Sequence, residues 1–206
     1  MAELTRLHPL EQITAEFVRN NNDAVTITAE PFVAMVGVRL PTDVFGTEVS
    51  GAELLGTRLP TTPNTWVASA AERVIWLGPD EWLLTSTAHV PEELTGRARE
   101  AVRPLGGVVT DVSAQRIGIR LTGRRARDVL AKGCSIDLHP VVFGHGRAAQ
   151  TSVGLAGVIL LAMSEAGEEF LLLVRSSFAG YLADWLLDAA QEFSTQELSD
   201  PTSVQE

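Results

Sequence analysis

Apolar and polar residues alternate over several short stretches of the chain, and this period of two predicts β-strands. The clearest case is Arg116–Leu121, which reads Arg-Ile-Gly-Ile-Arg-Leu. One face of this strand is apolar, and the other carries the guanidinium groups of Arg116 and Arg120. Short apolar runs predict further strands at Phe32–Leu40, Thr65–Ala70, Arg73–Leu77, Glu81–Thr85, Val108–Val112, Gln150–Val153, Gly157–Ala162 and Glu169–Val174.

Apolar residues recur at helical spacing between these strands. Pro91–Val102 and Ser176–Phe193 are predicted as the two long helices, the second with a serine N-cap at position 176 or 177. A shorter helix is predicted after the turn at Thr122-Gly123, with Thr122 as its N-cap and Gly133 as its stop. This strand-turn-helix unit contains no G-x-G-x-x-G and no P-loop motif.

The order of strand, hairpin, strand and helix occurs twice, which indicates an internal repeat. Glu-Trp-Leu-Leu at 81–84 and Glu-Phe-Leu-Leu at 169–172 lie 88 residues apart, and each ends a predicted hairpin before a long helix. We therefore predict an α+β fold of two similar sheet-plus-helix halves, at 31–112 and 113–193. Long surface loops are expected at 41–63 and 133–147.

The two ends of the chain are predicted to lie outside this repeat. Residues 1–30 are expected to form an N-terminal arm, or a short helix with one apolar face. The polar residues 194–206 are expected to form a disordered tail. The residues at helical spacing in the N-terminal segment are Leu10, Ile13, Phe17 and Val18.

Charge and composition narrow the class of protein. The formal net charge of −10 excludes nucleic acid and anionic membranes as expected partners, because both require a basic surface. The single cysteine excludes an intrachain disulfide and a cysteine-based zinc site. The chain has neither a secretory signal nor an apolar run of about 20 residues, so we expect a cytoplasmic protein.

A few side chains could carry chemistry, but each has a simpler structural interpretation. His139 and His145 share a loop with Asp137, yet their spacing matches no helical metal motif. Cys134 would be a nucleophile only beside a histidine, and a small buried thiol is the simpler interpretation. Asp111 and Ser113 follow a strand as ordinary turn residues do, although they could begin a nucleophilic pair.

Arginine and aromatic clusters also leave two interpretations open. Arginines at 124, 125 and 127 would either bind an anion at the predicted helix start or face solvent. Tryptophans at 66, 76 and 82 would either stack a planar ligand, such as a pterin or flavin, or lie in a core. Tyr181 and Trp185 are interpreted as helix packing. We therefore expect no catalytic, cofactor-binding or metal-binding residue on this chain.

An ordered series of short motifs resembles the gamma subunit of heterotetrameric sarcosine oxidase, from about residue 30 to residue 193. The motifs are Leu77-Gly78-Pro79-Asp80-Glu81-Trp82-Leu83-Leu84, Asp111-Val112-Ser113 followed by Arg116, Leu121-Thr122-Gly123, Ala126-x-x-Val129-Leu130, Gly133-Cys134, Asp137-Leu138-His139-Pro140, Phe143-x-x-Gly146, Gln150-Thr151, Val174-Arg175-Ser176-Ser177-Phe178-Ala179 and Tyr181. This family is similar in fold to the folate-binding aminomethyltransferases of the glycine cleavage system.

The resemblance implies a small subunit of a four-subunit flavoenzyme that packs against the alpha subunit, with beta and delta subunits in the same complex. Such complexes oxidatively demethylate sarcosine to glycine and release hydrogen peroxide, with formaldehyde or methylenetetrahydrofolate as the second product. FAD, FMN, NAD, tetrahydrofolate and zinc are then expected on the partner subunits, and no cofactor on this chain.

Three other functions stay open at this point. The chain could belong to a related N-methyl amino acid dehydrogenase, such as one for N-methylglutamate. It could be a stand-alone folate-dependent aminomethyltransferase, for which Asp111 is the candidate carboxylate that orients the amine. It could also be a regulatory or assembly module without a stable partner.

Overall fold

The computed structural model describes residues 8–41 and 53–195. The helices are α1 (Thr14–Asn20), α2 (Pro91–Val102), α3 (Ala126–Ala131) and α4 (Ala179–Thr195), with 3-10 turns η3 (Arg103–Leu105) and η4 (Ser176–Phe178). The strands are β1 (Thr26–Ala29), β2 (Ala34–Arg39), β3 (Glu53–Leu54), β4 (Thr57–Arg58), β5 (Trp66–Ser69), β6 (Glu72–Gly78), β7 (Glu81–Ser86), β8 (Val108–Asp111), β9 (Arg116–Thr122), β10 (Ala148–Val153), β11 (Ala156–Ala162) and β12 (Glu169–Arg175).

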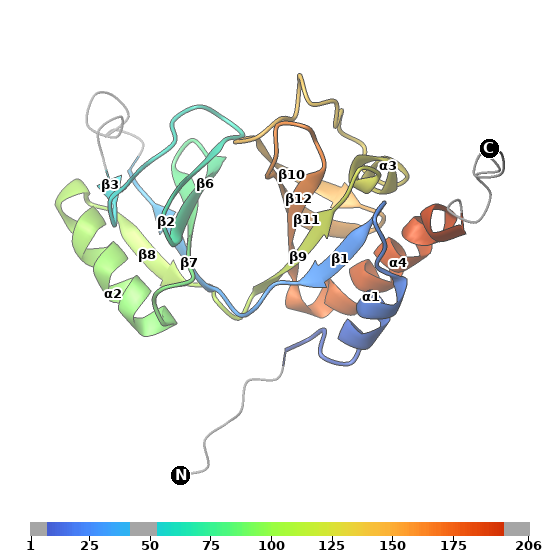
Figure 1. The fold of residues 1–206 in the computed structure, drawn as a ribbon. Helices are drawn as coiled ribbons and strands as arrows, with labels where there is room; N and C mark the ends of the chain where they lie inside the picture. The colour runs from blue at the N-terminus through green and yellow to red at the C-terminus, as the bar shows by residue number, and fades with distance from the viewer. Residues whose placement is uncertain (1–7, 42–52, 196–206) are drawn as a thin grey trace, which may run out of the picture.

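Two five-stranded sheets form the body of the molecule (Figure 1). The first sheet has the order β5-β6-β7-β2-β8, and the second has the order β10-β11-β12-β9-β1. Neighbouring strands are antiparallel in both sheets. The prediction of an α+β fold with two similar halves is confirmed.

The two sheets match strand for strand, with one exchange. The hairpins β6–β7 and β11–β12 occupy the same place in their sheets, and α2 and α4 follow them. The edge strand next to β2 is β8, from the same half, whereas the edge strand next to β9 is β1, from the N-terminus. The structure thus differs from the prediction of a separate arm at 1–30, because β1 completes the second sheet.

Helix α1 also belongs to the second half. Phe17 is only 1% exposed and lies in the core between the helices and the second sheet, together with Leu10 and Ile27. Val18, the next residue, is 70% exposed, so the predicted apolar face was wrong at this position. At the other end, α4 extends to Thr195, and the rest of the predicted tail lies outside the described residues.

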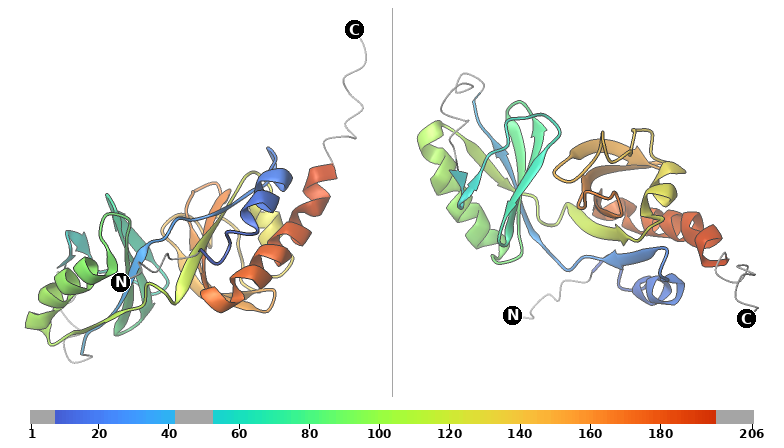
Figure 2. Two further views of the ribbon diagram at one scale, coloured as in Figure 1. Left: turned by 90° about the horizontal axis from the view of Figure 1, so that it is seen from below. Right: turned by 45° about the horizontal axis from the view of Figure 1, so that its top comes forward.

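The molecule has four layers, with the helices on the outside and the sheets facing each other (Figure 2). Helix α2 covers the first sheet, and α1, α3 and α4 cover the second. A third apolar cluster lies between the sheets and draws on both halves, with Met35, Ile75 and Leu83 from one, and Leu161 and Leu171 from the other. This shared core fixes the two halves against each other.

The predicted caps of two helices were wrong. Strand β9 continues through Thr122, which pairs with Glu169, so α3 begins later, at Ala126, and has no side-chain cap. The Ser176 hydroxyl donates to the carbonyl of Ala114 instead of capping α4. Gly133 is needed for packing rather than for a left-handed stop, because a Cβ there would lie 2.4 Å from the Trp185 ring.

The predicted long loops are partly anchored. Within 41–63, the hairpin β3–β4 places Leu54 in the core of the first half, while residues 42–52 lie outside the described part of the chain. Within 133–147, Leu138 and Phe143 are each 5% exposed and contribute to the core of the second half. These segments therefore contribute to folding as well as covering the surface.

Candidate functional site

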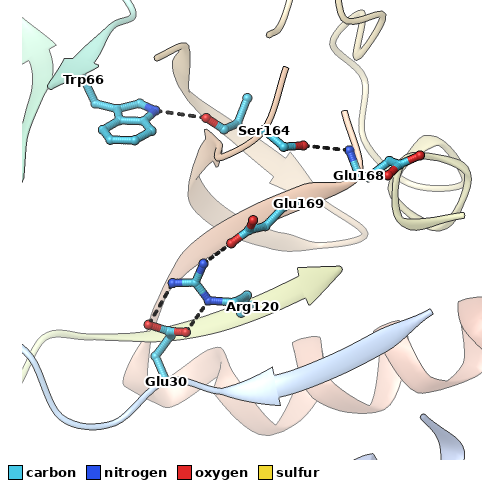
Figure 3. Close-up of polar contacts among 7 residues, drawn as sticks. Glu30, Trp66, Arg120, Ser164, Glu168 and Glu169 are labelled. Atoms are coloured by element: carbon cyan, nitrogen blue, oxygen red, sulfur yellow. Dashed lines mark hydrogen bonds and ion pairs between the residues drawn. The ribbon is translucent and has the colours of Figure 1, made fainter. Parts of the chain in front are cut away.

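Arg120 holds two carboxylates at the inner face of the second sheet (Figure 3). Its Nε donates to Glu30 Oε1 at 2.6 Å and its Nη2 donates to Glu30 Oε2 at 3.2 Å, which is the two-point geometry that guanidinium and carboxylate groups favour. Its Nη1 donates to Glu169. Hydrogen bonding to Glu30 is the main reason that the pKa of Arg120 is raised above its ordinary value.

The packing around this pair depends on Gly118, which neighbours Arg120 on the inner face of β9. A Cβ at Gly118 would lie 2.9 Å from the Cβ and Cγ atoms of Glu30, so a larger residue would displace the Glu30 side chain. The strand pattern predicted that Arg120 lies on the face opposite the apolar side chains of β9, and this is confirmed, because those side chains lie in the core of the second half while Arg120 lines the space between the sheets. It did not predict the partners, because Glu30 lies in the N-terminal segment expected to be an arm.

Arg73 approaches the same region from the first sheet. Its guanidinium lies over the Trp66 ring, with Cζ 5.2 Å from the ring centroid. The buried Nε of Arg73 has no hydrogen-bond acceptor among the described residues. Burial lowers the pKa of Arg73, and the positive charge of Arg120 lowers it further.

A pocket of about 240 Å³ opens between the two sheets at this point, and we refer to it as the intersheet pocket. Its charged lining residues are Glu30, Glu72, Arg73 and Arg120. Its other lining residues are mostly small or apolar: Val33, Met35, Ala68, Ala70, Ala71, Thr85, Thr87, Gly118, Leu171 and Leu173.

The pair at Asp111 and Ser113 cross-links the two connections between the halves. The Ser113 hydroxyl donates to Asp111 Oδ1 at 2.6 Å, and the backbone N–H of Met35 donates to the Ser113 hydroxyl oxygen at 2.9 Å. The β1–β2 and β8–β9 connections pass side by side here (Figure 1), where the N–H of Val112 also donates to the Met35 carbonyl. This arrangement supports a structural role, since Ser113 bonds to Asp111 and Met35 and to no histidine within residues 8–41 and 53–195.

A second pocket, of about 310 Å³, borders this cross-link. It is lined by Pro9, Phe32, Pro91, Asp111, Ser113, Ala114, Arg116, Ile117 and Ser176. Burial lowers the pKa of Arg116, and the like charge of Arg175, its direct cross-strand neighbour, lowers it further.

The other polar candidates do not converge on one site. His145 lies edge-on to Trp66, with ring centroids 5.0 Å apart, whereas His139 is exposed and its backbone N–H donates to Asp137. Within the described ranges, no three His, Cys, Asp or Glu side chains are close enough to hold a metal ion. Cys134 is partly buried and packs against the core of the second half.

The arginines near α3 likewise do not converge on one site. Arg125 pairs with Asp128 at 2.9 Å and lies over the Phe193 ring, so its guanidinium is already engaged by the protein. Arg124 is exposed and Arg127 half-buried. The structure does not arrange the three guanidinium groups to bind one anion together.

The tryptophans are divided between two cores. Trp82 is fully buried under α2 and donates its indole N–H to the carbonyl of Pro60 at 2.8 Å, while Trp76, directly opposite, packs against the same core. Trp66 faces the second sheet and donates to the carbonyl of Ala162 at 3.2 Å. This division supports the interpretation of the tryptophans as core residues, rather than as a platform that stacks a planar ligand.

Exposed apolar side chains remain on the surface of the described chain. Leu155 is 83% exposed, and its N–H donates to the hydroxyl oxygen of Tyr181 at 3.0 Å. Tyr181 and Trp185 pack on the adjacent Gly154 turn, which agrees with their interpretation as helix packing. Other exposed apolar residues are Val18, Phe32, Val90, Val108, Val141, Val142 and Phe178. No helix of the described chain is long and apolar enough to cross a membrane.

Comparison with known sequences matches the chain to one protein family. The model of the "Sarcosine oxidase, gamma subunit family" matches residues 42–192. A protein named "Sarcosine oxidase subunit gamma" from Arthrobacter sp is 37% identical over 196 residues, which is 92% of this chain and 92% of that protein. A protein of the same name from Corynebacterium sp. (strain P-1) is 35% identical over 200 residues, or 94% of each chain.

Structure comparison agrees with the sequence matches. The solved heterotetrameric sarcosine oxidase from Corynebacterium sp. U-96, in complex with pyrrole 2-carboxylate, contains a chain that is 33% identical with a TM-score of 0.81. The match covers 92% of this chain and 97% of that chain. Glycine cleavage system aminomethyltransferase T from Bartonella henselae shares the fold, with a TM-score of 0.58 at 15% identity, over 85% of this chain and 48% of that chain.

Proposed function

Because this chain belongs to the sarcosine oxidase gamma subunit family, we propose that it is a non-catalytic subunit that supports the assembly of a heterotetrameric sarcosine oxidase. The match to one chain of a solved heterotetramer, over 97% of that chain, carries this proposal. The complex would act in the cytoplasm and convert sarcosine to glycine, hydrogen peroxide, and formaldehyde or methylenetetrahydrofolate.

In this proposal the chain packs directly on the alpha subunit, and beta and delta complete the complex. FAD, FMN, NAD, tetrahydrofolate and zinc would be bound by the partner subunits. Two structural observations support a non-catalytic role. Ser113 and Asp111 bond to each other at the crossing of the two connections, and exposed apolar side chains such as Leu155 offer surface for a subunit interface.

The test is co-expression of the four subunits, with and without this chain, followed by size exclusion and an absorbance spectrum. With the chain present, we expect a yellow flavin-bearing species that contains all four subunits and makes peroxide from sarcosine. Without it, we expect loss of the assembled species. A flavin complex that assembles and turns over normally without this chain would contradict the proposed role.

Substrate choice requires a separate measurement on the same complex. We expect peroxide formation with sarcosine and little activity with N-methylglutamate. Reduction of the bound flavin by N-methylglutamate and not by sarcosine, without peroxide formation, would retain the subunit role but assign the chain to an N-methyl amino acid dehydrogenase.

A further inference from the structure

Arg73 is partly buried, and it is the charged lining residue of the intersheet pocket for which the described structure supplies no ion-pair partner. Its Nε is buried and has no acceptor, and its flat face is covered by Trp66 at 5.2 Å. Burying a cation without a hydrogen-bonded counter-charge is costly in free energy. A guanidinium group of this kind at the wall of a pocket can act as the binding site for an anion.

The neighbouring carboxylates do not fill this place. Glu30 and Glu169 both bond to Arg120, and Glu30 uses both of its oxygens. Glu72, the residue before Arg73 in β6, accepts from the Ser86 hydroxyl at 3.4 Å and lies 3.5 Å from His89 Nε2. The pKa of Arg73 is lowered by burial and by the positive charge of Arg120, and the nearby negative charges of Glu30 and Glu169 do not offset these two effects.

The pocket has room for a small molecule beside Arg73. Its volume of about 240 Å³ is below the range of about 300–1,000 Å³ typical of drug-sized ligands. Ala68 lies directly opposite Arg73 across the β5–β6 hairpin, and Thr85 lies opposite it across the β6–β7 hairpin. Ala68 and Ala70 line the pocket and are exposed, so the pocket opens to solvent next to the hairpin turn.

We propose that the intersheet pocket binds a small monocarboxylate, with the carboxylate accepting hydrogen bonds from the guanidinium of Arg73. The planar guanidinium fork matches a carboxylate at two points. Glu30 and Glu169 both pair with Arg120, and Glu72 contacts His89, so Arg73 is the charged lining residue that is left to pair with a monocarboxylate. A doubly charged phosphate would be repelled more strongly by the nearby carboxylate of Glu30. The proposal goes beyond the assembly role and does not depend on it.

The test uses the full-length chain, labelled with ¹⁵N, and acetate as the probe at constant ionic strength. We expect a saturable shift of the Arg73 Nε–H resonance with acetate and no saturable shift with acetamide, the neutral analogue of the same shape. Arg73→Gln should weaken acetate binding at least tenfold, or about 1.4 kcal/mol. Arg99→Gln, the same change on an exposed helical surface, should leave the affinity unchanged.

Two further variants keep the test decisive if Arg73→Gln does not fold. Arg73→Lys retains the charge without the fork, and we expect intermediate affinity. Ala68→Leu fills the pocket without any change of charge and should abolish the acetate response. The proposal is overturned if the folded wild-type chain shows no saturable acetate response, if acetamide binds equally well, or if Ala68→Leu or Arg73→Gln binds acetate as the wild type does.

Discussion

Arg120 and Arg39 make the same kind of bridge in different surroundings, which lets the effect of burial be measured at single residues. Arg120 joins Glu30 and Glu169, and its side chain is 26% exposed. Arg39 joins Asp80 and Glu81 at 3.1 and 2.7 Å, and its side chain is 55% exposed. Coulombic attraction is weaker where water screens the charges.

We expect Arg120→Met to lower the free energy of unfolding by about 2–3 kcal/mol, because it leaves two half-buried carboxylates without their donor. Arg39→Met should cost less than about 1 kcal/mol, since exposed ion pairs contribute little. Urea unfolding of the two full-length variants measures both values. Equal losses would show that the intersheet position of Arg120 gives its ion pairs no added importance.

At the scale of elements, the N-terminal segment differs most from the predictions: a short helix was one of the two alternatives and is present as α1, whereas β1 was not predicted. Phe17 is 1% exposed and Val18 is 70% exposed, although they are neighbours in one short helix. We expect Phe17→Ala to cost about 3–5 kcal/mol, because it removes a ring from the core of the second half. Val18→Ala, the matched control, should change stability by less than about 0.5 kcal/mol.

Thermal and urea unfolding of these two variants provide the measurement. If residues 8–29 formed an independent arm, both substitutions would leave the main transition unchanged. A large loss in Phe17→Ala alone would establish that the N-terminal segment unfolds cooperatively with the second half.

The successes and failures of prediction have a common physical cause. Strand β9 was predicted from its alternation of apolar and polar residues, and β12, which is buried on both faces, from its continuous apolar run. The repeat was visible because each hairpin leads into a long amphipathic helix. Strand β1 was missed because Thr-Ile-Thr-Ala is short, and only pairing with β9, about 90 residues later, makes it a strand. Thr122 was misassigned for the same reason, since its cross-strand partner Glu169 keeps it extended.

Prediction of the candidate site was limited in the same way, because contacts between distant strands cannot be read from local sequence. The polar face of β9 could be predicted from its alternation, so the position of Arg120 followed from the sequence. The convergence of Arg73, Arg120 and Glu30 on one pocket could not, because it depends on how one sheet faces the other. The sorting of the tryptophans into two cores depends on the same packing.

At the scale of the whole molecule, the two halves are tied together at three places. Their inner faces share an apolar core that includes Ile75 and Leu161. The two connections between them are cross-linked by Ser113. On the other side of the molecule, the backbone N–H of Trp66 donates to the Gly146 carbonyl at 2.8 Å, and Thr65 forms an isolated antiparallel β-bridge with Arg147. These ties predict that the halves unfold as one cooperative unit.

Leu94→Ala tests this prediction, because Leu94 is fully buried in the core that belongs to the first half alone. The substitution should cost about 2–5 kcal/mol. Native-state hydrogen exchange then gives the opening free energies of β7, in the same half, and of β12, in the other half. One cooperative unit requires both strands to lose the same free energy. Val141→Ala, at a site that is 87% exposed, should change neither strand. If β7 alone lost protection, the first half would open while the second stayed folded, and the intersheet pocket would lose the wall that the first sheet provides.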